Sequence, residues 1–136
     1  MVDVSIHKSL SDNPTVQGYA RELSDFLNGR SISGRIGRYG GFERNNEATK
    51  SSIMKVHIKM AGEGFWSSDI SQINRTSNNY LVYANHWDFS DKVQIIAIVT
   101  PDAHERIDRL LPDIIRITEN DFHSLSEAEL NQLEFY

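Results

Sequence analysis

The stretch YLVYANHWDFSDKVQIIAIV, residues 80–99, carries the clearest structural signal of the chain. Residues 80–87 are rich in aromatic and β-branched side chains, which is typical of a strand. Residues 93–99 are nearly all apolar, as expected of a central strand covered on both faces. Because only a short polar turn separates the two segments, they are predicted to pair as an antiparallel hairpin.

Two segments upstream alternate between apolar and polar side chains, which is the pattern of half-buried strands. The first covers residues 2–8 and the second covers residues 53–60. In the second segment the apolar residues predict a buried face, and Lys55, His57 and Lys59 share the opposite face. A helix is predicted between these strands, because proline follows Asp12-Asn13, apolar residues recur at helical spacing over 16–27, and Gly29 lies where a C-terminal cap belongs.

Two helices are predicted after the hairpin. Thr100 is expected to cap the first, with Pro101 in its first turn and Pro112 interrupting or restarting it. Residues 124–127 (SLSE) form a capping-box pattern that opens a short acidic helix near the C-terminus. The order of elements predicts an α+β fold, a small antiparallel sheet with helices packed on one face and an acidic C-terminal helix.

Residues 29–50 differ from the rest of the chain. They hold five of the eight glycines, several arginines and few apolar side chains, so a long mobile loop is predicted here. In this loop Arg35 and Arg38 could bind phosphate and Tyr39 could stack on a base; the alternative is a flexible linker. The glycine spacing matches neither a Walker A nor a dinucleotide motif, so no nucleotide cofactor is expected.

Length and composition set the broad class. With 136 residues, 39% hydrophobic, the chain is predicted to be a single domain over 1–136. The chain contains no cysteine, and its five histidines show no paired spacing, so neither a disulfide nor a metal site is expected. No membrane-spanning or secretory segment is recognisable, so we expect a cytoplasmic protein without a membrane partner.

The net charge of −5 is unevenly distributed. Residues 30–59 carry +5 and residues 101–136 carry −6. The basic part can attract phosphate, whereas the acidic region at 119–136 can bind a basic partner or cover the basic part.

Five side chains suggest phosphate chemistry. Lys55, His57 and Lys59 form a row that can hold successive phosphates, although a solvated outer sheet face explains them as well. Arg75 lies just before the hairpin and His104 just after it, where the two could reach one site. An ordinary surface arginine and a first-turn helix histidine are the alternatives for these two residues.

Several short motifs stand out between roughly residues 23 and 104. They are DF at 25–26, IGR at 36–38, VHI at 56–58, QINRTSN at 72–78, LVY at 81–83, IIAI at 95–98 and TPDAH at 100–104. Through these motifs the chain resembles the YafO-type toxins of bacterial type II toxin–antitoxin systems, which are related to RelE-like toxins. The resemblance implies a ribosome-dependent mRNA interferase, an endoribonuclease that a cognate antitoxin holds inactive.

The chemistry that the resemblance implies is metal-independent transesterification. A base takes the proton of the 2′-hydroxyl, a cation stabilises the phosphorane, and an acid protonates the leaving 5′-oxygen. Arg75, His57 and His104 fall in the matching motifs. We assign Arg75 to phosphate stabilisation and His104 to proton transfer. His57, with Lys55 and Lys59, would bind the substrate backbone, and Arg38 would add a phosphate contact.

A second hypothesis is a non-enzymatic protein-binding module, such as an immunity protein or inhibitor. Toxins of this type are commonly basic, whereas this chain carries −5. The acidic region at 119–136 would then be the surface that binds a basic partner.

Overall fold

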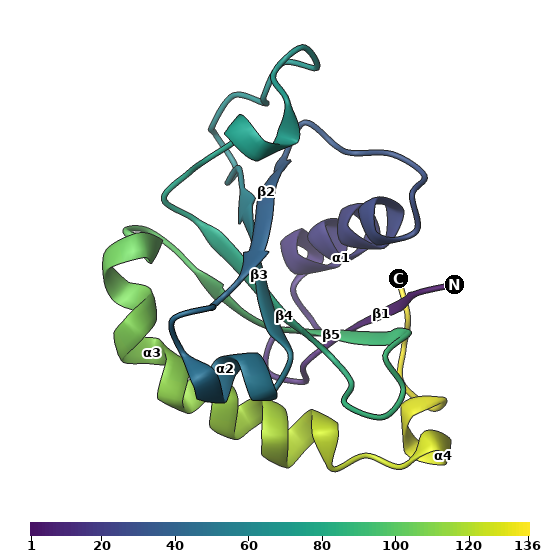
Figure 1. The fold of residues 1–136 in the computed structure, drawn as a ribbon. Coiled ribbons are helices and arrows are strands. Elements are labelled where there is room, and N and C mark those ends of the chain that lie inside the picture. Colours follow the sequence, from purple (N-terminus) through teal and green to yellow (C-terminus); the bar gives the residue numbers. More distant parts are fainter.

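A five-stranded sheet, with strand order β1-β5-β4-β3-β2, forms the centre of the computed structural model, which describes residues 1–136 (Figure 1). Strands β2 to β5 pair antiparallel, and β1 adds to β5 in parallel, so the sheet is mixed. The strands are β1 (Asp3–Ile6), β2 (Ile36–Gly41), β3 (Ile53–Ile58), β4 (Tyr80–Asn85) and β5 (Lys92–Val99). The predicted hairpin of the last two strands is confirmed.

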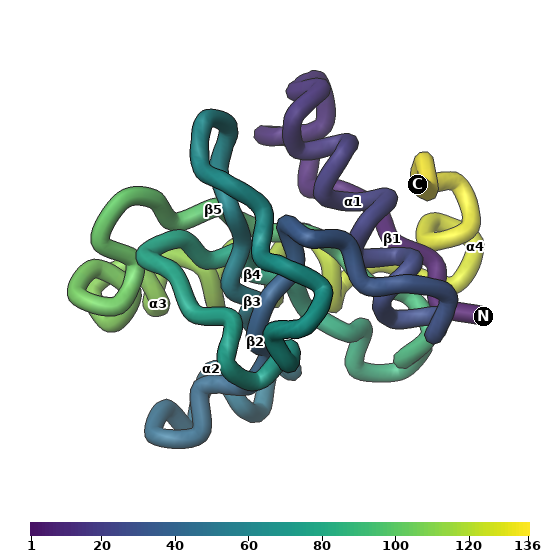
Figure 2. The backbone as a smooth tube through the Cα atoms, turned by 90° about the horizontal axis from the view of Figure 1, so that it is seen from above, coloured from purple at the N-terminus to yellow at the C-terminus, as the bar shows by residue number.

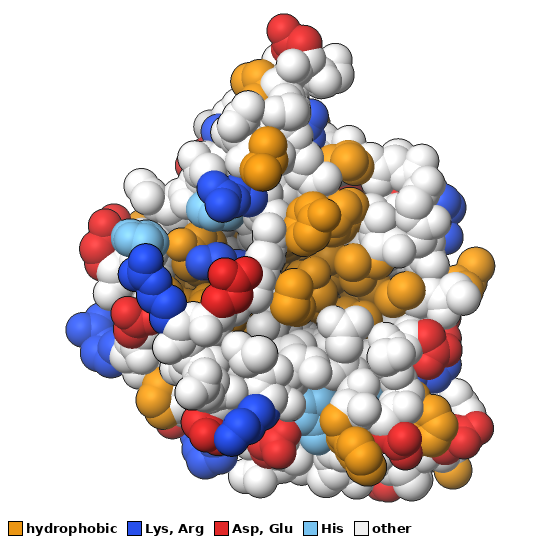
Figure 3. Space-filling view, in the orientation of Figure 1, with side chains coloured by type: hydrophobic (Ala, Val, Ile, Leu, Met, Phe, Trp, Pro, Cys, Tyr) orange, Lys and Arg blue, Asp and Glu red, His pale blue; other side chains and the backbone are white.

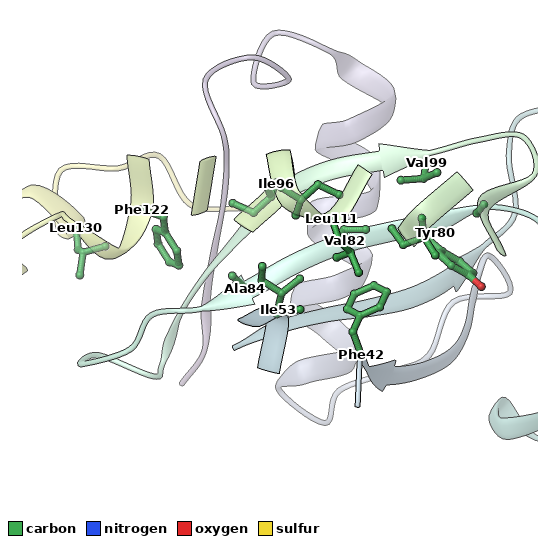
Figure 4. Packing of buried hydrophobic residues seen from close by; sticks show 14 residues of the cluster. Phe42, Ile53, Tyr80, Val82, Ala84, Ile96, Val99, Leu111, Phe122 and Leu130 are labelled. Atoms are coloured by element: carbon green, nitrogen blue, oxygen red, sulfur yellow. The ribbon is translucent and has the colours of Figure 1, made fainter. Parts of the chain in front are cut away.

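Two hydrophobic cores lie on opposite faces of the sheet. Along β4 the side chains alternate: Tyr80, Val82 and Ala84 enter one core, whereas Leu81 and Tyr83 enter the other. The first core packs against α3 (Ala103–Thr118) and the small helices α2 (Asn46–Lys50) and α4 (Glu127–Leu130); Figure 4 shows its residues. The second core packs against α1 (Pro14–Leu27).

The predicted α+β class, small sheet and C-terminal helix are confirmed. The structure adds that α1 covers the face opposite α3, which explains why β4 and β5 are apolar on both sides. No helix is both long enough and apolar enough to cross a membrane.

Helix α1 begins and ends where the sequence predicts. The Asn13 side chain accepts hydrogen bonds from the backbone N–H groups of Thr15 and Val16 at 2.9 and 3.4 Å. At the other end Gly29 has a positive φ of 70°, and the next N–H, of Arg30, returns to the Asp25 carbonyl at 2.8 Å. This is the Schellman arrangement that glycine favours.

The long mobile loop predicted for residues 29–50 is wrong over half of its length, because β2 and α2 lie within it. Strand β2 pairs with β3, and its Gly37 serves close packing rather than mobility. A Cβ added at Gly37 would lie 2.5 Å from the Arg75 carbonyl oxygen and 2.7 Å from the Trp66 ring. The strand cannot be recognised from its arginine- and glycine-rich sequence, because few apolar side chains mark its buried face.

Helix α3 starts later than predicted. It begins at Ala103, after Asp102 with a φ of 56°. Thr100 does not cap it, since its hydroxyl instead donates to the Asn79 side-chain oxygen at 2.6 Å. The first turn of α3 is thereby placed beside the start of β4.

Pro112 does not interrupt or restart α3, which contains it as one continuous helix. Proline removes one backbone hydrogen bond, which ordinarily costs about 3 kcal/mol or more in a helix interior. Burial of apolar side chains on both sides of Pro112 offsets this cost, at roughly 1.5–3 kcal/mol for each fully buried chain. These side chains are Ile107, Leu111 and Ile114.

The C-terminal segment, residues 119–136, wraps around the β1 side of the sheet (Figure 2). It contains a π-helical turn (Glu119–His123) and α4, whose capping box joins Ser126 and Glu129, two residues later than predicted. The backbone N–H of Tyr136 donates to the Val4 carbonyl at 2.9 Å. The segment therefore protects the free edge of β1, as natural sheets commonly require.

Candidate functional site

Two histidines far apart in the sequence meet beside the first turn of α3. His57 lies on β3 and His104 on α3, with Tyr80 of β4 between them. The His57 and Tyr80 rings meet edge to face with centroids 4.9 Å apart, and the Tyr80 hydroxyl lies 3.4 Å from His104 Nδ1. Three adjoining pockets share His104 in their walls.

Basic side chains line the same pockets. Arg38 of β2 and Lys55 of β3 border two of the three. We call the surface formed by Arg38, Lys55, His57, Tyr80 and His104 the histidine cleft. Figure 3 shows histidine and basic side chains gathered around a hollow at the left of the molecule, with acidic side chains at its rim.

His57 is held through its Nδ1 atom. This nitrogen lies 2.8 Å from the N–H of Ser77 and 3.0 Å from the Ser77 carbonyl oxygen. In the neutral tautomer with its proton on Nδ1, His57 donates to the Ser77 carbonyl and leaves Nε2 unprotonated; in the other neutral tautomer, Nδ1 accepts from the Ser77 N–H and Nε2 carries the proton. A general base requires the first of these tautomers. Nε2 has no hydrogen-bond partner in the protein and is the nitrogen that remains for a substrate.

The surroundings of His57 favour its neutral form. Burial lowers the pKa of His57 below its ordinary value, and the positive charges of Lys55 and Arg38 act in the same direction. A hydrogen bond to the Ser77 backbone opposes this shift. At neutral pH the ring is therefore a proton acceptor, as a general base must be.

Lys55 is positioned by two aromatic rings. Its Nζ lies 4.7 Å from the Tyr80 ring centre and 5.0 Å from the Phe42 ring centre. Burial lowers the pKa of Lys55, with Arg38 acting the same way, whereas the carboxylates of Asp108 and Glu43 oppose the shift. An ammonium group fixed in this way can stabilise an anionic ligand without first losing its own freedom of movement.

The cationic groups of the cleft have no acidic partner. None of the ion pairs in the structure includes Arg38 or Lys55. Arg38 is also exposed. Two cations that stand unpaired beside two histidines form a site suited to a phosphate group.

Arg75 lies elsewhere, contrary to the arrangement predicted with His104. It is buried, and its guanidinium donates to backbone carbonyls, among them those of Ile70 at 3.0 Å and Ile36 at 3.1 Å. Arg75 borders none of the three pockets. In this arrangement it joins the loop after β3 to β2, because its donors are directed at protein rather than at solvent.

The remaining basic and aromatic candidates are engaged by other side chains. Arg35 pairs with Glu22 and lies over the Tyr19 ring, and Lys59 lies over the Trp66 ring at 4.8 Å. Tyr39 borders one pocket of the cleft, but its ring packs against Phe26 of α1 at 5.2 Å between centroids. The structure thus brings together Arg38, Lys55, His57 and His104, and it leaves Arg35, Lys59 and Arg75 outside the cleft.

Three residues of the cleft walls were not foreseen. Tyr80 reads as a core aromatic in the sequence, and its ring is indeed buried, yet it joins the two histidines. Glu43 and Asp108 also line the walls. Nothing in the sequence distinguishes them from ordinary surface carboxylates; only the fold places them beside Lys55.

Comparison with known proteins gives one match. A family model described as "Toxin YafO, type II toxin-antitoxin system" matches residues 24–124. Among curated proteins and among solved structures, no match to the chain was found. The matched region contains every residue of the histidine cleft and ends before α4.

Proposed function

The chain belongs to the YafO toxin family of type II toxin–antitoxin systems, and from this membership we propose that it is an endoribonuclease that cleaves mRNA through the histidine cleft. The observation that carries the proposal is the meeting of His57, Tyr80 and His104 next to two unpaired cations. Membership in such a system also implies a cognate antitoxin as partner.

The proposed reaction is transesterification within the RNA strand. His57 Nε2 takes the proton of a 2′-hydroxyl, whose oxygen then forms a bond to the adjacent phosphorus. The bond from phosphorus to the 5′-oxygen breaks, and protonated His104 gives that oxygen a proton. The products are a 2′,3′-cyclic phosphate and a 5′-hydroxyl, so atoms and charges balance without a further reactant.

Lys55 and Arg38 take the role that the sequence assigned to Arg75. Both border the pocket that contains the two histidines, and both can donate to the phosphorane oxygens as negative charge develops. Tyr80 acts as a positioning residue, because its hydroxyl contacts His104 and its ring supports both His57 and Lys55.

Ribosome dependence is part of the proposal. A net charge of −5 gives little general attraction for RNA, since phosphate contacts dominate such affinity. A small cationic cleft on an acidic protein therefore suits a substrate that is presented by another particle, and we propose that cytoplasmic ribosomes present the mRNA.

The test is induced expression in a bacterial host, with primer extension on a reporter mRNA that is either translated or blocked from translation. We expect growth arrest, and cleavage of the translated message only, with fragments that end in a cyclic phosphate. His104→Ala should abolish both, whereas Arg109→Ala, an exposed change on the same helix, should abolish neither. Normal growth and an intact message from folded protein would instead support the protein-binding module.

A further inference from the structure

One wall of the histidine cleft opens into a larger cavity. It has a volume of about 690 Å³ and lies between the β2–α2 connection and α3. Its apolar lining comes from Phe42, Ile107 and Leu111, which are buried in the first core. The rest of its lining is mostly polar or charged, so a ligand held there would be contacted mainly through hydrogen bonds and charges.

The rim of this cavity carries both positively and negatively charged side chains. Arg38 and Arg44 supply guanidinium groups, and Glu43 and Asp108 supply carboxylates. All four side chains are exposed, and none belongs to an ion pair of the structure. Carboxylates beside a phosphate site oppose phosphate binding, so their presence calls for a ligand with hydrogen-bond donors.

Guanine is the RNA base whose donors and acceptors match this rim. Its N1–H and N2 amino group present two adjacent donors to a carboxylate, and its O6 and N7 present two acceptors to an arginine. Adenine and cytosine offer an amino group but no adjacent ring N–H, and uracil offers a single N–H.

We propose that this cavity, the base pocket, binds the guanine of the nucleotide next to the cleaved phosphate, and that Glu43 and Asp108 select it. The inference rests on the proposed ribonuclease function, because the base pocket shares Arg38, Lys55 and His104 with the histidine cleft. A base seated there brings its own phosphate to the histidines, so the pocket couples base identity to cleavage position.

The first experiment maps cleavage ends on a reporter mRNA that carries guanine or adenine at matched positions. Wild-type protein should favour guanine by at least about tenfold, since one good bidentate contact discriminates by roughly that factor or more. Glu43→Gln and Asp108→Asn should reduce the guanine-to-adenine ratio toward one. Asp113→Asn makes the same chemical change on the exposed side of α3 and should leave the ratio unchanged.

The guanine-to-adenine cleavage ratio shows whether Glu43 and Asp108 select the base or act only through their charge. If Glu43 and Asp108 only help to keep Lys55 charged, their variants will lower total cleavage but keep the guanine preference, which overturns the inference. Cleavage by the wild type without guanine preference also overturns it, while the proposed ribonuclease function stands.

A second measurement is independent of cleavage. Titration of the purified protein with guanosine 3′-monophosphate and adenosine 3′-monophosphate, followed by NMR, should show tighter binding of the guanine nucleotide and loss of this preference in Asp108→Asn. Should the wild type cleave no RNA and still prefer the guanine nucleotide, the base pocket stands and the ribonuclease proposal fails. Equal binding of both nucleotides counts against the pocket in either case.

Discussion

Charged side chains are paired with each other at one end of the sheet and are unpaired at the other. At the β1 end, Lys92 Nζ contacts Asp3 at 2.6 Å, and His7 Nε2 contacts Asp121 at 2.8 Å. In the histidine cleft at the opposite end, Arg38 and Lys55 have no acidic partner within ion-pair distance.

The contrast separates charges that serve the fold from charges that are free to bind. A paired charge of the β1 end has its partner within the protein, so its removal acts on stability. An unpaired, partly buried cation beside histidines retains its capacity for an external anion. The acidic C-terminal segment belongs to the first kind, because Asp121 binds His7 and Glu129 caps α4.

The largest effect is expected for His57→Ala. Loss of a general base lowers a rate by about 10²–10⁴-fold, and cleavage of translated message should fall by that factor. Stability should change little, since His57 is only partly buried and binds one neighbouring peptide. Quantitative primer extension measures the first quantity, and urea unfolding of the purified variant measures the second. Cleavage within threefold of the wild type would remove His57 from the proposed mechanism.

Arg75→Ala should show the reverse pattern. The change leaves four backbone carbonyls without the donors that Arg75 supplies, and the hydrogen bond to that of Ile36 is buried. We expect a loss on the order of 3 kcal/mol in the free energy of unfolding. Folded protein at low temperature should still bind guanosine 3′-monophosphate. If the variant keeps wild-type stability but has lost cleavage, Arg75 takes part in the reaction after all.

The different outcomes for these two residues show what the sequence can predict. Period-two alternation places Lys55 and His57 on one strand face, and turn and helix-start signals place His104 at the end of the hairpin. Local pattern therefore places Lys55 beside His57, but the meeting of His57 with His104 through Tyr80 depends on the tertiary fold. The surroundings of Arg75 depend on carbonyls from residues 33–36 and 67–70, which only the tertiary fold brings together.

Strand β2 could not be predicted from the sequence for a related reason. Gly37 is required because Trp66 and the Arg75 carbonyl approach it, and this contact lies between segments distant in sequence. A glycine that permits close packing and a glycine that permits motion look alike in a sequence. Glu43 and Asp108 are hidden likewise, since an exposed carboxylate is the commonest residue on a surface helix or turn.

Removal of residues 131–136 tests the assignment of the C-terminal segment to the β1 end. The deletion removes the hydrogen bond from Tyr136 to Val4 and the contacts of Phe135 with Lys92 and of Tyr136 with Arg21. We expect a loss of about 1–2 kcal/mol in unfolding free energy. Cleavage and its salt dependence should stay at wild-type values. An unfolding free energy equal to that of the wild type would show instead that these residues do not hold the edge of β1.

The smallest effect concerns the pH dependence of stability. His86 is buried, its Nε2 has no hydrogen-bond partner, and burial lowers its pKa, with His123 adding to the shift. Below the unfolded value of about 6.5 the unfolded chain binds a proton that the native state does not, so stability falls as pH decreases. His57 contributes in the same direction, because its pKa is also lowered.

His86→Asn separates the two contributions. Asparagine can replace Nδ1 as acceptor for the N–H groups of Asp88 and Phe89, and it does not titrate. Urea unfolding between pH 7.5 and 5 should therefore show a shallower loss of stability in this variant than in the wild type, and His57→Asn should reduce the loss further. If the slope is unchanged in His86→Asn, His86 is protonated equally in both states, and its burial beside His123 is without effect on folding at low pH.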